Sequence, residues 1–174
     1  MGRPVFPSLV WLALFDTGCP DSWSDPCGSC GAQCVLEAIP SPGAEHVEGE
    51  VVYDVLPPTG GAHHECWAEW GVHTEEVADE AWVHNLEHGG VAFLYNCPDG
   101  CPEDVATLTQ LVEGLPVLAL LSPYAAMESR FAATAWGYRL LLECADVDAL
   151  GAFYEDHVGH APEYEIGGPP DDCG

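Results

Sequence analysis

Two histidines four residues apart, His84 and His88, are the pair in this sequence best suited to share a metal ion. On a helix, side chains four residues apart project from one face, whereas on a strand they would lie about 13 Å apart. Gly89 directly follows the pair and favours a helix that ends there, because glycine readily adopts the left-handed conformation that closes a helix. His63 follows a glycine-rich turn and is a third candidate ligand, with His64 as its competitor. The spacing therefore predicts a metal site built from His63, His84 and His88.

The identity of the metal depends on whether Met127 joins these histidines. A thioether binds copper well and zinc poorly, so three imidazoles with a methionine predict copper, whereas three imidazoles with a water would suit zinc. Besides Met1, Met127 is the only methionine in the chain, and the alternative for it is to fill a gap in the core. We favour a copper-binding protein that serves storage, delivery or electron transfer, with a copper-accepting or copper-donating protein as its partner. The predicted copper ligands are His63, His84, His88 and Met127.

The same motif, His-x-x-Glu-His, is also the inverted zinc-peptidase pattern, in which Glu87 would be the base that activates water. The predicted helix is short and ends at once in two glycines, which argues against an enzyme. Glu163, in an Ala-Pro-Glu loop, is the one downstream carboxylate that we would name as a further zinc ligand. We therefore favour a binding protein over an enzyme and keep a zinc-dependent hydrolase as the alternative.

Cys97 and Cys101 form a second candidate site, between an apolar run and a proline that opens a helix. A helix N-terminus favours the thiolate, so such a pair suits thiol exchange or the capture of a soft metal. A structural disulfide that closes the loop is the third possibility. The stretch CPDGCP at residues 97–102 resembles a segment of the thioredoxin-like copper chaperones that assemble cytochrome oxidase.

The cysteine content indicates an oxidising compartment. Nine cysteines occur in 174 residues without the paired spacing of a zinc ribbon. The apolar run at residues 5–15 resembles an export signal, is too short to span a membrane, and precedes Cys19, a candidate lipid acceptor. If Cys19 carries lipid, the remaining cysteines can form four disulfides. We expect an exported protein, either periplasmic or an outer-surface lipoprotein.

The charge of the chain excludes one class of partner. Three basic residues stand against 29 acidic ones, which gives a formal net charge of −26. Affinity for nucleic acid comes mainly from Lys and Arg, so neither nucleic acid nor an anionic membrane surface is an expected partner. A disulfide-stapled module that binds another protein through its acidic face is a further alternative.

The elements that must position these residues predict an α/β fold. We divide the chain into an export signal at residues 1–19, an irregular Cys-rich segment at 20–45 and one α/β domain at 46–174. We predict strands over residues 51–56, 91–95, 117–121, 131–136 and 138–143, and helices over residues 79–88, 102–114 and 146–157. A βαβ unit followed by ββα is the order of a thioredoxin-like core.

From His46 to about Glu163 the sequence resembles a bacterial family known as the domain of unknown function 3105. The resemblance rests on motifs that follow in order: His46-Val47, PPTGGAH at 57–63, WGV at 70–72, VHNLEHGG at 83–90, PYAAM at 123–127, ATAWG at 133–137 and APE at 161–163. Gly60 replaces a usual serine, and His73 stands where an aromatic residue is commoner. The resemblance implies a shared fold and an exported, often membrane-anchored setting, and it assigns no activity.

Overall fold

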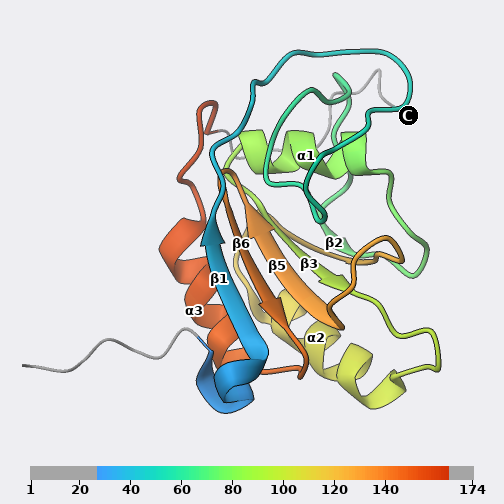
Figure 1. The fold of residues 1–174 in the computed structure, drawn as a ribbon, viewed down its shortest axis with the longest axis vertical. Helices are drawn as coiled ribbons and strands as arrows, with labels where there is room; N and C mark the ends of the chain where they lie inside the picture. The colour runs from blue at the N-terminus through green and yellow to red at the C-terminus, as the bar shows by residue number, and fades with distance from the viewer. Residues whose placement is uncertain (1–26, 165–174) are drawn as a thin grey trace, which may run out of the picture.

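The computed structural model describes residues 27–164, which form one mixed six-stranded sheet covered by helices on both faces (Figure 1). The predicted export signal and the candidate lipid acceptor Cys19 lie outside the described residues. No helix among residues 27–164 is long and apolar enough to cross a membrane. The elements are a short 3-10 helix η1 (Gly28–Gln33), β1 (Cys34–Ala38), β2 (Gly71–Val72), α1 (Asp79–Glu87), β3 (Val91–Tyr95), α2 (Pro102–Gly114), β4 (Ala119–Pro123), β5 (Phe131–Ala135), β6 (Tyr138–Leu142) and α3 (Val147–His157).

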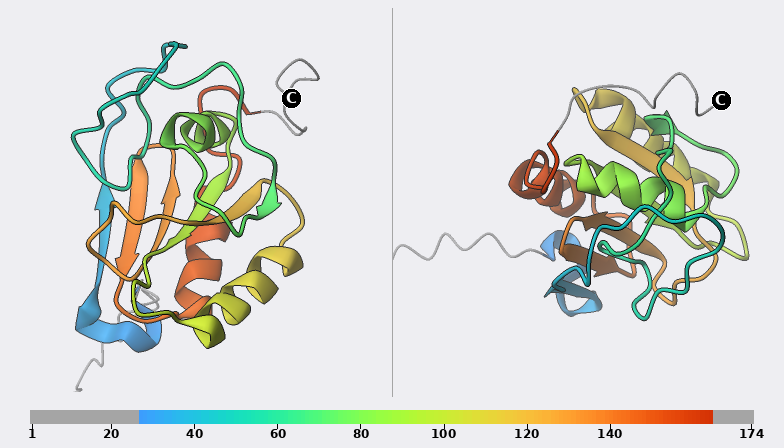
Figure 2. Two further views of the ribbon diagram at one scale, coloured as in Figure 1. Left: turned by 90° about the vertical axis from the view of Figure 1, so that its right-hand side faces the viewer. Right: turned by 90° about the horizontal axis from the view of Figure 1, so that it is seen from above.

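The strand order β1-β6-β5-β3-β4-β2 places β3 near the centre of the sheet. The β3-α2-β4 unit is parallel, and β5 and β6 then add antiparallel strands on the other side of β3. The predicted α/β class and the βαβ-ββα order are therefore confirmed. Helices α2 and α3 pack on one face of the sheet and α1 packs on the other (Figure 2).

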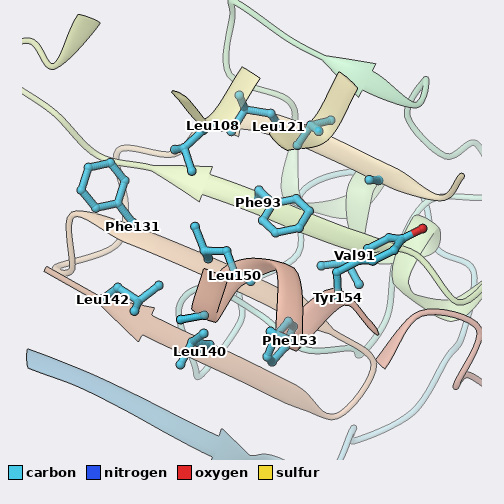
Figure 3. Close-up of a cluster of buried hydrophobic side chains, with 14 of the residues drawn as sticks. Val91, Phe93, Leu108, Leu121, Phe131, Leu140, Leu142, Leu150, Phe153 and Tyr154 are labelled. Carbon is cyan, nitrogen blue, oxygen red and sulfur yellow. The ribbon is translucent and has the colours of Figure 1, made fainter. Parts of the chain in front are cut away.

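The core explains why β3 is a continuous apolar run. Because successive side chains point to opposite faces of a strand, Val91 and Phe93 face α2 and α3, whereas Ala92 and Leu94 face α1. Figure 3 shows the first of these two clusters, in which the labelled side chains of the sheet meet those of the two helices. It contains Val91, Phe93, Leu108, Leu121, Phe131, Leu140, Leu142, Leu150, Phe153 and Tyr154.

Three predictions of local structure are corrected. Residues 51–56 form no strand: the Val51 amide donates to Glu80 on α1, and Val52 is 87% exposed. The strand predicted at 117–121 begins at Ala119, because Leu118 has a left-handed φ of 52° that turns the chain before it enters the sheet. Within the segment predicted to be irregular, β1 pairs antiparallel with β6 and extends the sheet.

The seven cysteines described by the structure are all disulfide-bonded. The bond between Cys30 and Cys144 ties the segment before β1 to the end of β6, and a second bond joins Cys27 to Cys34. Cys97 and Cys101 are also bonded, which is the third of the possibilities that the sequence left open for this pair, with their Cα atoms 5.8 Å apart. The length of β3 separates this pair from α1, so the pair supplies no thiolate to a site on that helix. The disulfides are compatible with an extracellular or otherwise oxidising location.

The start of α1 carries a testable pH dependence. The N-cap of this helix is Ala78, and the carboxylate of Asp79 accepts a hydrogen bond of 2.8 Å from the Tyr124 hydroxyl. Burial raises the pKa of Asp79 to about 6, and the hydrogen bond from Tyr124 only partly offsets this effect. The folded protein therefore holds the Asp79 proton more tightly than the unfolded chain does. This contribution to stability is complete below about pH 4 and is lost as the pH rises through 6.

We expect Asp79→Asn to raise the free energy of unfolding at pH 7.5 by about 1 kcal/mol after screening by solvent, and to change it little at pH 4. Urea unfolding at both pH values measures the difference. Asp99→Asn, in an exposed loop, is the control and should change neither value. An equal gain at both pH values would show that ionisation of Asp79 is not the cause.

Candidate metal centre

Four side chains from three segments converge beside the last turns of α1. His84 and Glu87 come from the helix, His63 from the loop after the PPTGG turn, and His46 from a segment that runs beside it. The His46 segment is held by two backbone bonds, from the Val47 amide to the His63 carbonyl (2.8 Å) and from the His63 amide to the Glu45 carbonyl (3.1 Å). One ligand atom from each of these four residues lies within 4.8 Å of the others. Ligands at about 2.0–2.2 Å from an ion are separated by roughly this much or less, so the group could hold a metal ion.

Backbone carbonyls orient three of the imidazoles. The Nδ1 atoms of His63, His84 and His88 lie 2.7–2.8 Å from the carbonyl oxygens of Gly61, His64 and Glu163, respectively. Because a carbonyl only accepts, each Nδ1 carries the proton and each Nε2 presents its lone pair. Metal-binding histidines usually have this arrangement, in which the outer nitrogen donates to the protein and the inner one binds the ion.

With these tautomers, atoms that can only accept hydrogen bonds face one another inside the cluster. The Nε2 of His63 lies 2.9 Å from the Glu87 carboxylate and has no donor as partner, although His63 is fully buried. The Nε2 atoms of His84 and His88 face each other at 2.8 Å. Two lone pairs at such distances repel unless a proton or a metal ion lies between them. Either a proton or a metal ion therefore lies between these atoms.

Within residues 27–164, no lysine or arginine pairs with Glu87. Glu87 is 3% exposed, and a buried carboxylate without a counter-charge is costly. The chain contains no lysine, and the two arginines of the described residues pair elsewhere, Arg130 with Asp104 and Arg139 with Glu37. Burial also lowers the pKa of His84 to about 4, which keeps this imidazole neutral at physiological pH. A metal ion would supply the missing positive charge.

Two tryptophans cover the imidazoles. The ring of Trp67 lies 4.4 Å from that of His88 and 5.0 Å from that of His84, measured between centroids, and Trp136 lies edge-on to His63 at 6.3 Å. On the other side His46 is about half exposed, with 45% of its side chain accessible. The cluster is therefore shielded by aromatic rings on its inner side and reachable from solvent at His46.

The HNLEHGG motif also contains the residues that hold this geometry. Asn85 is fully buried, accepts from the Ala68 amide (2.8 Å) and donates to the Ala68 carbonyl (2.9 Å), which fixes the loop that carries Trp67. Gly89 has a left-handed φ of 87° and ends the helix. A Cβ atom at Gly90 would lie 2.4 Å from the Trp70 ring, so only glycine fits. The motif therefore combines metal-binding side chains with the residues that position them.

The structure places the His84 ring 4.7 Å from that of His63 and 4.7 Å from that of His88, measured between centroids. His88 nevertheless groups with Glu87 and Glu163 and not with His63, so a single site shared by His63, His84 and His88 stays a prediction. His64, the competitor of His63, turns its ring to the Gly49 carbonyl (2.9 Å) and contributes only its backbone oxygen to the cluster. Met127 lies in the hydrophobic cluster between α1 and the sheet and is 3% exposed. Its role as a thioether ligand stays a prediction.

Sequence reasoning missed His46 as a member of the group and considered Glu87 only as a base. No periodicity connects His46 to α1, because 38 residues separate it from His84. The one available signal was its position in the first motif of the family resemblance. The Glu87 carboxylate could have been chosen as a ligand from its place between two histidines on one helix face.

The comparisons with known proteins bear on the family alone. Residues 46–169 match the model of the family described as "Protein of unknown function (DUF3105)". No curated protein and no solved structure matches the chain. The thioredoxin-like label and the resemblance of residues 97–102 to copper chaperones therefore stay predictions. Because the match covers well over half of the sequence and includes all four residues of the cluster, the chain belongs to the DUF3105 family.

Proposed function

We propose that this protein binds copper, as Cu(II), at the cluster of His46, His63, His84 and Glu87, and that it stores or delivers the ion in an oxidising compartment. The observation that carries the proposal is the convergence of three imidazoles and a buried carboxylate within 4.8 Å of one another, with no lysine or arginine of the described residues paired with Glu87. Three imidazoles and a carboxylate suit a borderline divalent ion, and Cu(II) binds such sites most tightly among the first-row divalent metals.

The donor set favours storage or delivery over electron transfer. Electron-transfer copper sites use a thiolate, which keeps both oxidation states stable, and the described cysteines are all in disulfides. Met127 is proposed as the soft ligand that would help to retain Cu(I). The chain is proposed to be exported, with the signal at residues 1–19 and a lipid on Cys19, and to exchange copper with a protein partner.

The test is a titration of the full chain, purified without a histidine tag and freed of metal, with Cu(II) and Zn(II) against a chromophoric chelator. We expect Cu(II) to bind more tightly than Zn(II) and to quench the fluorescence of the nearby Trp67. Replacing His84 by Ala removes a ligand and should lower the Cu(II) affinity at this cluster by at least about 100-fold. His73→Ala is the matched control, because the His73 ring hydrogen-bonds to the Glu69 carbonyl (2.8 Å) and lies outside the cluster.

Met127→Leu should leave Cu(II) binding intact and weaken the retention of Cu(I). Equal binding by the His84→Ala and His73→Ala variants would refute the proposed site. A wild-type chain that binds neither ion would refute the proposed function.

A zinc-dependent hydrolase is the second candidate, and one observation favours it. An open hollow of about 480 Å³ lies beside the exposed edge of His46 and is lined by His46, Val47, Glu48, Gly49, His64, Glu65 and Cys66. A small substrate could approach the cluster there. Zinc-loaded protein that cleaves peptide or ester substrates, with loss of turnover in Glu87→Gln, would support this candidate over copper storage.

A further inference from the structure

We propose that the centre holds two metal ions, the second bound by His88, Glu163 and the shared carboxylate of Glu87. This inference rests on the proposed function, because it adds an ion beside the first. One ligand atom from each of Glu87, His88 and Glu163 lies within 4.8 Å of the other two. Glu87 is the one residue that belongs to both groups, so its carboxylate would bridge the two ions.

The assignment of ligands follows from the two neighbouring imidazoles. An imidazole nitrogen has one lone pair and serves one ion, and His84 belongs to the first group whereas His88 belongs to the second. Their rings stack at 4.7 Å between centroids, with the Nε2 atoms 2.8 Å apart. Two ions about 3.5–4 Å apart, a common spacing in two-metal sites, would each take one of these rings.

The Glu87 carboxylate contacts the first group through one of its two oxygens. Its Oε2 atom contacts the Nε2 of His63 at 2.9 Å and faces that of His46 at 3.9 Å. The Oε1 atom would then bind the second ion. Glu87 is 3% exposed and His88 is 6% exposed, so two of the three ligands of the second ion are buried.

The loop after α3 is fixed against the end of α1, which places Glu163. The Glu163 amide donates to the Glu87 carbonyl (3.1 Å), and the Glu163 carbonyl accepts from the Nδ1 of His88 (2.7 Å). The Gly159 amide donates to the Gly89 carbonyl (2.8 Å). The backbone of the loop is thus tied to the same helix turn that carries the two shared ligands.

Charge distinguishes the two positions. The second position adds the carboxylate of Glu163, and a chain with a net charge of −26 attracts cations to both. Each position has one exposed ligand, His46 at the first and Glu163 at the second. An ion can therefore reach either position from solvent, as a storage or delivery protein requires.

The experiment measures copper stoichiometry and electron paramagnetic resonance on the full-length, tag-free protein titrated with Cu(II). We expect two tightly bound ions per wild-type chain and a resonance signal smaller than the copper content, because ions bridged by a carboxylate are magnetically coupled. Glu163→Gln removes the anionic ligand and should reduce the stoichiometry from two to one while restoring the full signal of the remaining ion. Glu155→Gln, an exposed carboxylate on α3, is the matched control and should keep two ions.

The outcomes separate this inference from the proposed function. One ion in the wild-type chain, with no change in Glu163→Gln, overturns the second position and leaves the first intact. Two ions in both proteins also overturn it, because the second ion then lies elsewhere. Absence of binding in the wild-type chain overturns the proposed function itself. His88→Gln provides a second variant and should also bind one ion, with its fold checked by circular dichroism.

Discussion

Glu87→Gln is expected to stabilise the metal-free protein and, at the same time, to remove most of the stabilisation that a metal ion provides. Without metal, the buried carboxylate lies 2.9 Å from the Nε2 of His63, another acceptor. A glutamine amide keeps the shape of the side chain, carries no charge, and can donate to this Nε2. Relieving an unsatisfied buried group should raise the free energy of unfolding of the metal-free form by about 1–3 kcal/mol.

The metal-bound form should respond in the opposite direction. At an ion concentration about 100 times the Kd, binding to the folded state alone adds about 2.7 kcal/mol to the wild-type protein. The neutral amide that replaces the Glu87 carboxylate is a weaker ligand, so this gain should fall below about 1 kcal/mol in the variant. Urea unfolding with Cu(II) and with a chelator measures both values.

The control is Glu80→Gln, a buried carboxylate on the same helix that accepts from the Val51 amide (2.6 Å) and lies outside the cluster. It should leave the difference between metal-bound and metal-free protein unchanged. A Glu87→Gln variant that is less stable without metal, and that keeps the full metal-dependent gain, would show that the Glu87 charge is already compensated.

Asn85→Ala is expected to cost about 2–4 kcal/mol of stability and to weaken metal binding. Asn85 satisfies both the amide and the carbonyl of Ala68, and its removal leaves two buried backbone groups without partners, each worth about 1–3 kcal/mol. The same bonds fix the loop that packs Trp67 against His84 and His88. Losing them should loosen the indole and lower the affinity of the site.

Urea unfolding followed by tryptophan fluorescence measures this loss. Asn96→Ala is the matched control, because Asn96 donates to the Met127 carbonyl (2.7 Å) from a partly exposed position, and we expect it to cost less than about 1.5 kcal/mol. Asn85→Asp should also be destabilising, since a carboxylate cannot donate to the Ala68 carbonyl. If Asn85→Ala and Asn96→Ala lower the free energy of unfolding equally, the two hydrogen bonds of Asn85 to Ala68 contribute no more stability than the bond of Asn96.

The local parts of this protein could be predicted from its sequence because their signals lie within a few residues. The apolar run of β3, the proline and acidic residues that open α2, and the closing glycine of α1 each act over one or two turns. The bond between Cys97 and Cys101 spans four residues and follows from the same local geometry. His84 and His88 share a face because of helical periodicity alone.

Long-range pairing decided the rest. Residues 34–38 become β1 only because β6 offers them a partner edge, whereas residues 51–56 alternate in a similar way and find none. A strand is completed by hydrogen bonds to a neighbour that can lie anywhere in the chain, so a short apolar stretch does not reveal whether that neighbour exists.

The candidate site divides in the same way. Helical spacing determined His84 and His88, and the glycine-rich turn indicated His63. Only the tertiary structure placed His46 beside His63 and brought Glu163 back to the end of α1, through backbone bonds between segments far apart in sequence.

The composition established that the chain has no lysine and three arginines, but the packing decided that none of the described arginines reaches Glu87. That packing surrounds the Glu87 carboxylate with imidazoles, and the cost of a buried charge depends on its burial and its neighbours.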